Sequence, residues 1–276
     1  MTVKCSVIVG TFRGGYLRAT LKSILAQSEP SFEILLMDDA NSPDVAELAA
    51  SLGDSRIKYH GNPTTLGPAL NHARGISLAC GKYVAIVNHD DLWEPETLDT
   101  LLSGLERHPD CVAAFSRPRV TTADGRFDES RTSHAWTTWD LTDVPAGRIG
   151  NWARDVRSTR LAFPSVVCAL MRTPELQAVK IPAAVGGSYD FWIGYQLSRT
   201  HPVLHLDEAV GYWREHPDNL TRVRSAKRSF EMAYIYSHVA LDRALPPKRR
   251  LYGAARLPRA YAVTAADYVR GARQGR

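Results

Sequence analysis

Cysteine is scarce in this sequence of 276 residues, which has four widely spaced ones: Cys5, Cys80, Cys111 and Cys168. No two of them form a C-x-x-C pair, so neither a zinc site nor the disulfide framework of a small secreted domain is indicated. The sequence also has no apolar run near the roughly 20 residues that a membrane-spanning helix requires. No charged leader with a cleavage site follows Met1. We therefore expect a cytoplasmic protein with reduced, buried thiols.

Acidic residues are scarce in the last part of the chain. Residues 222–276 contain 13 Lys or Arg against three acids, while the rest of the chain holds 21 basic and 26 acidic residues. The net charge of +5 thus combines an acidic body with a basic tail. The tail has no zinc-finger spacing and no aromatic motif for stacking bases, so nucleic acid is not an expected partner. Two roles stay open: packing on the body or in a homodimer, which we favour, and peripheral contact with an anionic membrane.

Hydrophobic residues make up 44% of the chain, enough for one large domain with an appendage. Short β-branched runs alternate with amphipathic stretches, the pattern of strand, crossover helix and parallel strand. The expected strands are 3–9, 32–37, 56–60, 83–87, 111–115, 166–171, 203–206 and 210–213. The expected helices are 17–25, 45–52, 66–79, 95–105, 190–199 and 227–244. This order predicts an α/β fold with a Rossmann-like parallel sheet, helices on both faces and a helical C-terminal tail.

Residues 117–160 interrupt this regularity and are rich in Arg, Thr, Asp and Trp. We expect a loop-dominated insertion there, and a long irregular segment in a compact domain is usually functional or mobile. Its tryptophans Trp136, Trp139 and Trp152 are candidates for stacking on an acceptor sugar. Core packing of a small subdomain is an equal alternative for them.

Polar residues follow three of the expected strands. The first strand is followed by Gly10, Thr11, Phe12 and Arg13, the second by Asp38, Asp39, Ala40 and Asn41, and the fourth by Asn88, His89, Asp90 and Asp91. In an open parallel sheet, ligands bind beyond the carboxyl ends of the strands. We therefore expect these carboxylates to converge on one rim.

A pair of acids after an apolar strand can coordinate a hard cation, which in turn neutralises a diphosphate. Asp90 and Asp91 fit this role, although an Asx turn or a cap before Pro95 would also explain them. The same alternative applies to Asp38 and Asp39. Two acidic pairs on one rim favour function over capping.

Together these segments resemble the inverting glycosyltransferases of family two, which have the GT-A fold. The resemblance is carried by three ordered motifs: Val7-Ile8-Val9-Gly10-Thr11-Phe12-Arg13, Met37-Asp38-Asp39-Ala40-Asn41-Ser42 and Val87-Asn88-His89-Asp90-Asp91. It covers about residues 3 to 221 and is strongest to about residue 115. It implies a nucleotide-sugar-binding half in residues 1–115, an acceptor-side half in 116–221 and a basic helical extension in 222–276.

The resemblance also implies roles for the residues at the rim. Phe12 would lie against the nucleobase, with Gly10, Thr11 and Arg13 completing this nucleotide-binding segment. Asp39 would accept a hydrogen bond from the ring N–H of the base, and Asp38 stands beside it as a further candidate. Asp90 would face the ribose or sugar. Asp91 would bind Mn²⁺ or Mg²⁺, which bridges both phosphates.

Two later segments match the family less closely. Gly186-Gly187-Ser188-Tyr189-Asp190-Phe191-Trp192 supplies Asp190 as the general base for the acceptor hydroxyl, although an acid at the start of a helix has a structural explanation too. Tyr212-Trp213-Arg214-Glu215-His216 is similar to the family's Tyr-Arg-x-His. His216 would then bind the metal or the diphosphate, and Arg214 would add positive charge.

Several positions depart from the family pattern. Asn71-His72-Ala73-Arg74 stands where many members have Ala-Arg-Asn, and His89 stands where a small or acidic residue is commoner. Tyr189 takes the place of the usual Glu. We therefore regard His72 and His89 as further site candidates, and an unusual donor or a different chemistry stays open.

The sequence thus predicts a metal-dependent transferase that moves a sugar from a nucleoside diphosphate sugar to a hydroxyl acceptor with inversion. UDP is the expected nucleotide, with GDP or TDP as alternatives. One competing hypothesis is a mutase or isomerase that rearranges the nucleotide-bound sugar. Another is a non-catalytic nucleotide-binding protein, which the two acidic pairs argue against.

Overall fold

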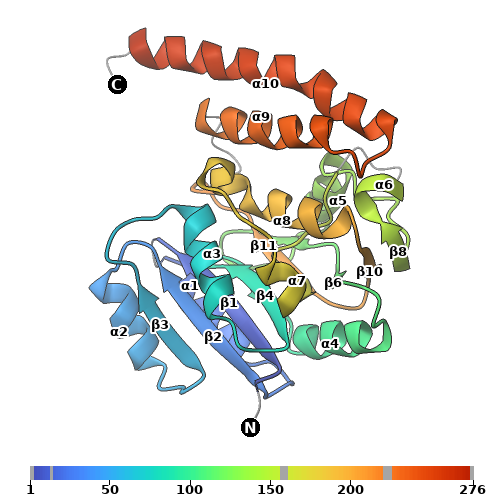
Figure 1. Cartoon of the computed structure of the whole chain (residues 1–276). Helices are drawn as coiled ribbons and strands as arrows, with labels where there is room; N and C mark the ends of the chain where they lie inside the picture. The colour runs from blue at the N-terminus through green and yellow to red at the C-terminus, as the bar shows by residue number, and fades with distance from the viewer. Residues whose placement is uncertain (1–2, 13–14, 156–160, 220–225, 274–276) are drawn as a thin grey trace.

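The computed structural model describes residues 3–12, 15–155, 161–219 and 226–273. Its centre is an eight-stranded sheet with the order β3-β2-β1-β4-β9-β6-β10-β8 (Figure 1). The strands are β1 Cys5–Thr11, β2 Phe32–Asp38, β3 Ile57–Gly61, β4 Tyr83–Asn88, β6 Ala113–Phe115, β8 Gly147–Asn151, β9 Ala169–Arg172 and β10 Pro202–His205. Strands β3, β2, β1 and β4 are mutually parallel, as expected from the βαβ pattern. Beyond them, β9 runs antiparallel to both β4 and β6, and β8 runs antiparallel to β10.

Helices cover both faces of the sheet because its inner strands are buried on both sides. Every residue of β1 and β2 is buried. One face packs against α1 Leu17–Leu25, α2 Pro43–Ser51 and α4 Thr97–Arg107. The other packs against α3 Pro68–Leu78, α7 Thr173–Gln177 and α8 Tyr189–Ser198. This arrangement confirms the expected α/β architecture with a helical layer on each side.

Local sequence accounts for several of the helix starts. Pro43 and Pro68 open α2 and α3, where the fixed φ of proline suits a helix and its missing N–H costs nothing. Helix α1 buries Leu17, Leu21 and Ile24 on one face, which is the spacing that the sequence shows. Most expected elements therefore lie within a few residues of their predicted bounds.

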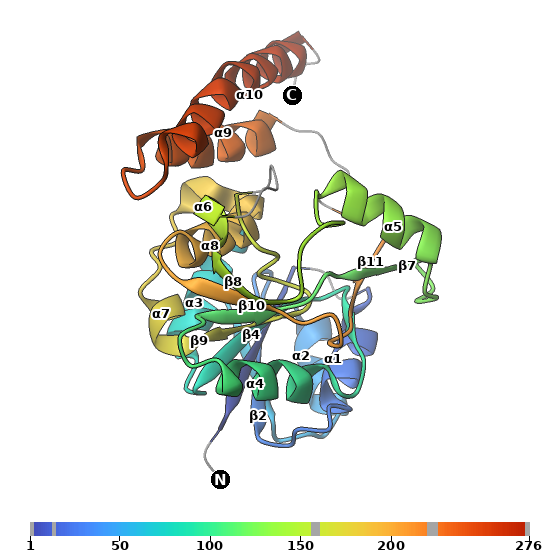
Figure 2. The same ribbon diagram turned by 90° about the vertical axis from the view of Figure 1, so that its right-hand side faces the viewer.

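Residues 117–160 are more regular than expected, within the part of the segment that the structure describes. They contain β7 Arg119–Thr121, α5 Glu129–Thr138, β8 and α6 Trp152–Asp155. A small second sheet has β11 Gly211–Arg214 at its centre, with β7 on one side and β5 Leu92–Trp93 on the other. Helix α5 lies beside β7 of this sheet (Figure 2). The prediction of a loop-dominated insertion was wrong. Helix α5 buries only the small side chains of Thr132 and Ala135, so its sequence shows little apolar periodicity. Its first turn is stabilised by Asp128, whose side chain accepts from the Arg131 amide.

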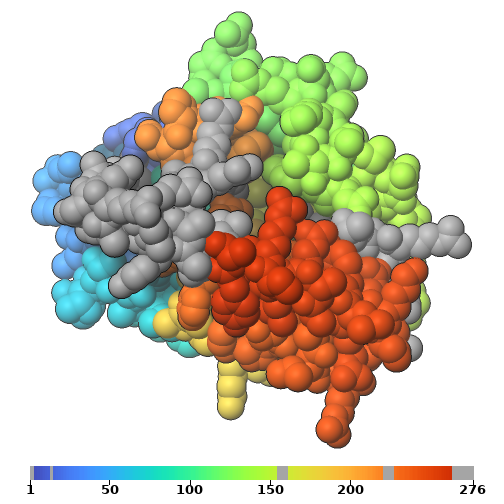
Figure 3. Space-filling model, turned by 90° about the horizontal axis from the view of Figure 1, so that it is seen from above, coloured from blue at the N-terminus to red at the C-terminus, as the bar shows by residue number. Residues whose placement is uncertain are grey.

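The C-terminal tail is helical, as expected, and its two helices form a hairpin. Helix α9 Ala226–Leu241 packs on the 3₁₀ segment η1 Ala183–Ser188, and α10 Pro247–Arg273 packs along α9 (Figure 1). Seen from above, the hairpin and α5 occupy different sides of the upper face (Figure 3). None of the helices in the described residues combines the length and apolar character that crossing a bilayer requires.

Candidate active site

The carboxyl ends of three neighbouring parallel strands form one rim. In the sheet register, Thr11 of β1 lies beside Asp38 of β2, and Gly10 lies beside Asn88 of β4. The structure therefore brings together the three polar segments that follow these strands. Arg13, the last residue expected in the first segment, lies outside the described residues.

Asp39 lies directly beyond β2, and the following loops hold its carboxylate. Its Oδ1 accepts hydrogen bonds from Asn62 Nδ2 at 2.8 Å and from the Leu66 amide at 2.7 Å. Its Oδ2 accepts from the Gly67 amide at 2.8 Å. These three hydrogen bonds orient the buried side chain. A carboxylate oxygen can accept about two hydrogen bonds, so Oδ2 can still accept one from a ligand.

Asp38 has a structural role that accounts for its whole carboxylate. It is fully buried, and it accepts hydrogen bonds from the amides of Ala40 and Ser42, which close the turn after β2. Tyr59 donates to it at 3.0 Å. Burial and this carboxylate raise the pKa of Tyr59 to about 12. The Asx-turn alternative therefore describes Asp38, and Asp39 is the member of this pair that stays a nucleotide-binding candidate.

Phe12 is the exposed aromatic side chain of the first segment, with 48% of its surface accessible at the end of β1. Gly10, two residues before it, lies against His72. A Cβ at Gly10 would approach the His72 ring to 2.5 Å, so only glycine permits this contact. The His72 Nδ1 is bonded to the Pro68 carbonyl, and burial lowers the pKa of His72 to about 4. His72 is therefore a neutral ring packed behind the rim.

Asp90 and His216 meet at the centre of the site. The His216 Nε2 lies 2.9 Å from Asp90 Oδ2, and both residues are buried. Asn219 orients the pair, since its Oδ1 accepts from the His216 amide at 2.7 Å and its Nδ2 donates to Asp90 Oδ2 at 3.4 Å. On the other side, the ring of Tyr16 lies 4.6 Å from the His216 ring.

Asp91 lies deeper than Asp90. It is fully buried, accepts from Asn88 Nδ2 at 3.0 Å and from the Arg214 amide at 3.3 Å. Burial raises the pKa of the Asp91 carboxyl well above its usual range, and the neighbouring charge of Asp90 adds to this rise. A positive charge nearby would oppose both effects.

Arg214 contributes to the frame of this site. Its Nε donates to the Asp90 carbonyl and its Nη1 to the Ala123 carbonyl, both at 2.9 Å. The guanidinium also lies 4.8 Å from the centre of the Tyr16 ring, a cation–π distance. The side chain thus ties the strand end after β4 to β11, where Arg214 itself is the last residue.

Tyr189 replaces the usual Glu and connects two parts of the rim. Its hydroxyl donates to Asn88 Oδ1 at 2.9 Å, and its ring stacks on His72 with centroids 4.0 Å apart. Burial raises the pKa of Tyr189 well above its usual range, so the phenol stays protonated. His89 lies close by, and burial lowers its pKa, so this histidine favours the neutral form.

Asp190 is the second residue of α8, directly after Tyr189. Ser165 donates to its main-chain carbonyl at 2.6 Å. Within the residues that the structure describes, no hydrogen bond or ion pair reaches its carboxylate. The carboxylate is therefore available for a ligand, and its position depends on where α8 begins.

The three tryptophans of the insertion differ in burial. Trp152 is fully buried and lies edge-on to Phe115 in the core. Trp136 donates to the Pro118 carbonyl at 2.8 Å, and Trp139 lies edge-on to Trp213. Trp152 therefore packs in the core of the main sheet instead of in a separate small subdomain. Trp136 and Trp139 are partly buried and stay acceptor-side predictions.

Two asparagines complete the site without having been singled out from the sequence. Asn62 donates to both Asp39 and Asn71, and Arg74 donates to its side-chain oxygen. Arg74 therefore reaches the Asp39 site through Asn62 instead of directly. Asn219 has a detectable signal, because an Asn three residues after His216 can close an Asx-type turn. Asn62 has none, as it follows β3 in an ordinary turn sequence.

The donor set fits a divalent cation that is shared with a diphosphate. In the described part of the chain, no three His, Cys, Asp or Glu side chains gather into a metal cage. Asp90 and His216 nevertheless present a carboxylate and an imidazole side by side, with His216 Nδ1 buried and unbonded among the described residues. Mg²⁺ and similar ions are commonly held by one or two protein ligands together with substrate phosphates.

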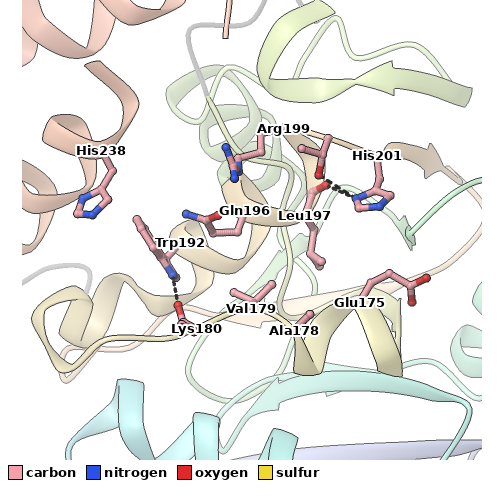
Figure 4. A pocket seen from close by; sticks show the side chains of 11 residues that line it. Glu175, Ala178, Val179, Lys180, Trp192, Gln196, Leu197, Arg199, His201 and His238 are labelled. Atoms are coloured by element: carbon pink, nitrogen blue, oxygen red, sulfur yellow. Dashed lines mark hydrogen bonds between the residues drawn. The ribbon is translucent and has the colours of Figure 1, made fainter. Parts of the chain in front are cut away.

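A separate pocket of about 470 Å³ lies on another side of α8, between α7 and α9 (Figure 4). Trp192 and Gln196 of α8 line it, together with His238 of α9 and Lys180. Trp192 Nε1 donates to the Lys180 carbonyl at 2.8 Å, which fixes the aromatic wall. None of the expected site residues lines this pocket.

Comparison with known sequences agrees with this geometry. The family model described as glycosyl transferase family 2 matches residues 6–164. An uncharacterized glycosyltransferase of Rickettsia conorii is 36% identical over 129 residues, which are 46% of this chain and 21% of that protein. A glucosyl-dolichyl phosphate glucuronosyltransferase of Haloferax volcanii is 30% identical over 115 residues, 40% of this chain and 37% of that protein. The matched part thus spans less than half of either relative.

Solved structures share the fold at low sequence identity. TarS 1–349 of S. aureus in complex with UDP-GlcNAc superposes with a TM-score of 0.68 at 16% identity, over 94% of this chain and 72% of that one. The mannosyltransferase PcManGT from Pyrobaculum calidifontis, in complex with GDP-Man and Mn²⁺, gives 0.62 at 17% identity, over 98% and 75%. The expected GT-A-type architecture is confirmed.

Proposed function

Because this chain belongs to glycosyl transferase family 2, we propose that it transfers a sugar from a nucleoside diphosphate sugar to a hydroxyl acceptor, with inversion. The observation that supports this most directly is the rim at the ends of β1, β2 and β4. It presents an exposed aromatic at Phe12, a pre-oriented carboxylate at Asp39 and the pair of Asp90 and His216. These are groups suited to a base, its ring N–H and a cation-bound diphosphate, in that order.

We assign the cation to Asp90 and His216. Asp91, which the resemblance alone would choose, is fully buried behind Asp90 and bonded to Asn88 and the Arg214 amide. In this assignment Asp91 orients Asn88 and adds negative charge from behind. Bound Mn²⁺ or Mg²⁺ supplies the positive charge that stabilises the departing diphosphate.

Asp190 is the proposed general base. Its carboxylate lies at the start of α8, next to Tyr189, whose hydroxyl contacts Asn88 at the rim. An ionised carboxylate there would accept the proton of the acceptor hydroxyl as its oxygen attacks the anomeric carbon. The sugar–phosphate bond breaks on the opposite face, so the configuration inverts.

The proposed donor is a nucleoside diphosphate sugar whose base carries a ring N–H. UDP and GDP are both represented among the structural neighbours, which include complexes with UDP-GlcNAc and GDP-Man. Asp39 can accept from the ring N–H of uracil, thymine or guanine alike. We therefore propose UDP as the first nucleotide to test, followed by GDP and TDP.

A thermal-shift panel tests the nucleotide site directly. UDP, GDP and TDP are each added with and without Mn²⁺, because a ligand of the folded state raises the melting temperature according to its affinity. A rise for one nucleotide that depends on Mn²⁺ is the expected result. No rise with any of them would contradict the proposal, and product analysis of the matching nucleotide sugar without acceptor would reveal rearrangement in place of transfer.

A further inference from the structure

A carboxylate of the C-terminal hairpin reaches into the loop before the proposed base. Glu231 lies on α9 and is buried, with only 5% of its surface accessible. Its Oε1 accepts from the Gly187 amide at 3.0 Å, and its Oε2 accepts from Ser188 Oγ at 3.1 Å. Both donors precede α8 by one or two residues.

These hydrogen bonds hold the two residues that lead into α8. Ser188 occupies the N-cap position, where a serine oxygen normally accepts from an amide in the first turn. Here its side chain makes no such bond and donates to Glu231. The carboxylate also lies at the positive end of the α8 dipole. Glu231 therefore anchors the entry into α8 from a distant part of the chain.

The backbone before α8 is shaped around the same carboxylate. Gly186 has φ 45° and ψ −123°, a conformation that residues with a Cβ rarely adopt. A Cβ at Gly186 would also meet Glu231 Oε1 at 1.9 Å. The glycine is thus required both by its own dihedral angles and by the approach of Glu231.

We propose that Glu231 is a positioning residue for Asp190, so that the C-terminal hairpin forms part of the catalytic unit. Asp190 follows Ser188 by two residues, and no hydrogen bond or ion pair within the described residues fixes its carboxylate. The start of α8 therefore determines where the carboxylate points, and Glu231 determines the start of α8. This inference depends on the proposed role of Asp190 as the base.

The test compares Glu231→Ala, Glu231→Gln and Ser188→Ala, with the exposed Glu47→Ala as a control for lost negative charge. UDP release from UDP-GlcNAc with Mn²⁺, or GDP release from GDP-mannose, gives kcat, and calorimetry gives the affinity for the nucleotide. We expect Glu231→Ala to lower kcat by about 10- to 100-fold, since a misplacement of about 1 Å can cost this much. Nucleotide affinity should change less than about threefold.

Glu231→Gln keeps one acceptor for the Gly187 amide and a donor for Ser188 Oγ, so it should recover most of the lost kcat. Ser188→Ala removes one contact from the opposite side and should lower kcat in the same way, with no further loss in the double variant. If Glu231→Ala does not fold, Ser188→Ala and Glu231→Gln still decide the question. Wild-type kcat in folded Glu231→Ala, or equal losses of kcat and nucleotide affinity in all variants, would overturn the proposal.

Hydrogen exchange separates this proposal from the proposed function. Amides in a peptide covering residues 186–198 should exchange faster in Glu231→Ala than in the wild type and the Glu47→Ala control. Unchanged exchange would show that Glu231 does not hold α8, whatever the activity. Full turnover in Asp190→Asn would instead refute Asp190 as the base while leaving the exchange result valid.

Discussion

The His216 Nε2 lies 2.9 Å from Asp90 Oδ2, although 126 positions separate the two residues in the sequence. Asp90 follows β4, and His216 follows β11 of the small second sheet. In the second sheet, β11 pairs with β5, which begins directly after Asp91. This pairing places His216 beside the residues that follow β4. The insertion and the second sheet are therefore needed to form the candidate site.

Asp90→Asn and His216→Ala are expected to weaken Mn²⁺-dependent nucleotide binding by at least about tenfold each, because each removes one of two proposed protein ligands. Affinity without metal should change little. Calorimetric titration of the nucleotide, with Mn²⁺ and with a chelator, measures both.

Asp91→Asn is the matched comparison. It is expected to lower the free energy of unfolding by about 1–3 kcal/mol, since an amide nitrogen would face one of the donors that Asp91 now satisfies. Its Mn²⁺ dependence should persist. Loss of that dependence in Asp91→Asn alone would return the cation to Asp91.

Phe12→Ala is expected to weaken nucleotide binding by about 1–3 kcal/mol with or without Mn²⁺, because stacking of a base on an aromatic ring has this magnitude. Phe230→Ala on α9 is a suitable control, as Phe230 is 50% exposed and Phe12 is 48% exposed. Equal affinities for Phe12→Ala and the wild type would remove Phe12 from the base site.

Asp190→Asn should lower kcat by about 10²- to 10⁴-fold, the usual contribution of a general base, with nucleotide affinity nearly unchanged. Steady-state kinetics with a competent acceptor and calorimetry with the nucleotide separate these quantities. A collapse of nucleotide affinity would place Asp190 in the donor site.

The N-terminal half of the fold was readable from the sequence for a simple reason. Its strands are buried on both faces, so they appear as continuous apolar runs, and α1 has a clear apolar stripe. Helix α5 was missed because tertiary packing of a few small residues, and not a stripe, stabilises it. Strands β7 and β8 are too short or too exposed to show alternation.

The candidate site was likewise predictable from the sequence only in part. The rim follows from strand order, and the family resemblance points to His216, but no local pattern tells which of two adjacent aspartates faces outward. Which aspartate faces outward depends on β11, because the Arg214 amide donates a hydrogen bond to the Asp91 carboxylate. Glu231 could not be found either, because an acid on an amphipathic helix is usually solvated.

His72 is expected to make the stability of the protein depend on pH. Its pKa is about 4 in the folded protein and near 6.5 in an unfolded chain, so the unfolded chain takes up the proton first as the pH falls. His72 should therefore cost nothing above pH of about 6.5 and destabilise the protein progressively toward pH 4, by about 3 kcal/mol in total. Denaturant unfolding from pH 7 to pH 4 measures this, and His72→Gln should flatten the slope. An unchanged slope would assign it to other buried histidines.

The last prediction concerns the basic tail, in which α9 packs on η1 and α10 packs along α9. Gly253 is buried at the contact between α10 and α9, and a Cβ there would meet Val239 Cγ1 at 2.8 Å and the Ala240 amide nitrogen at 3.1 Å. Gly253→Val is therefore expected to force the helices apart and to lower the free energy of unfolding by about 1–3 kcal/mol. Ala254→Val, at the exposed neighbouring position, is the matched control.

Thermal unfolding of both variants, and of a chain ending at Pro246, measures how far the hairpin stabilises the body. Because α9 carries Glu231, loosening α10 should also lower kcat in Gly253→Val more than in Ala254→Val. The basic side chains of Lys248, Arg256 and Arg259 are exposed and could contact an anionic membrane. The same variants test this alternative. If the tail serves only a membrane, Gly253→Val will keep the wild-type melting temperature and kcat, and salt-sensitive co-sedimentation with anionic vesicles will disappear in the chain ending at Pro246. That combination would reverse our preference for packing.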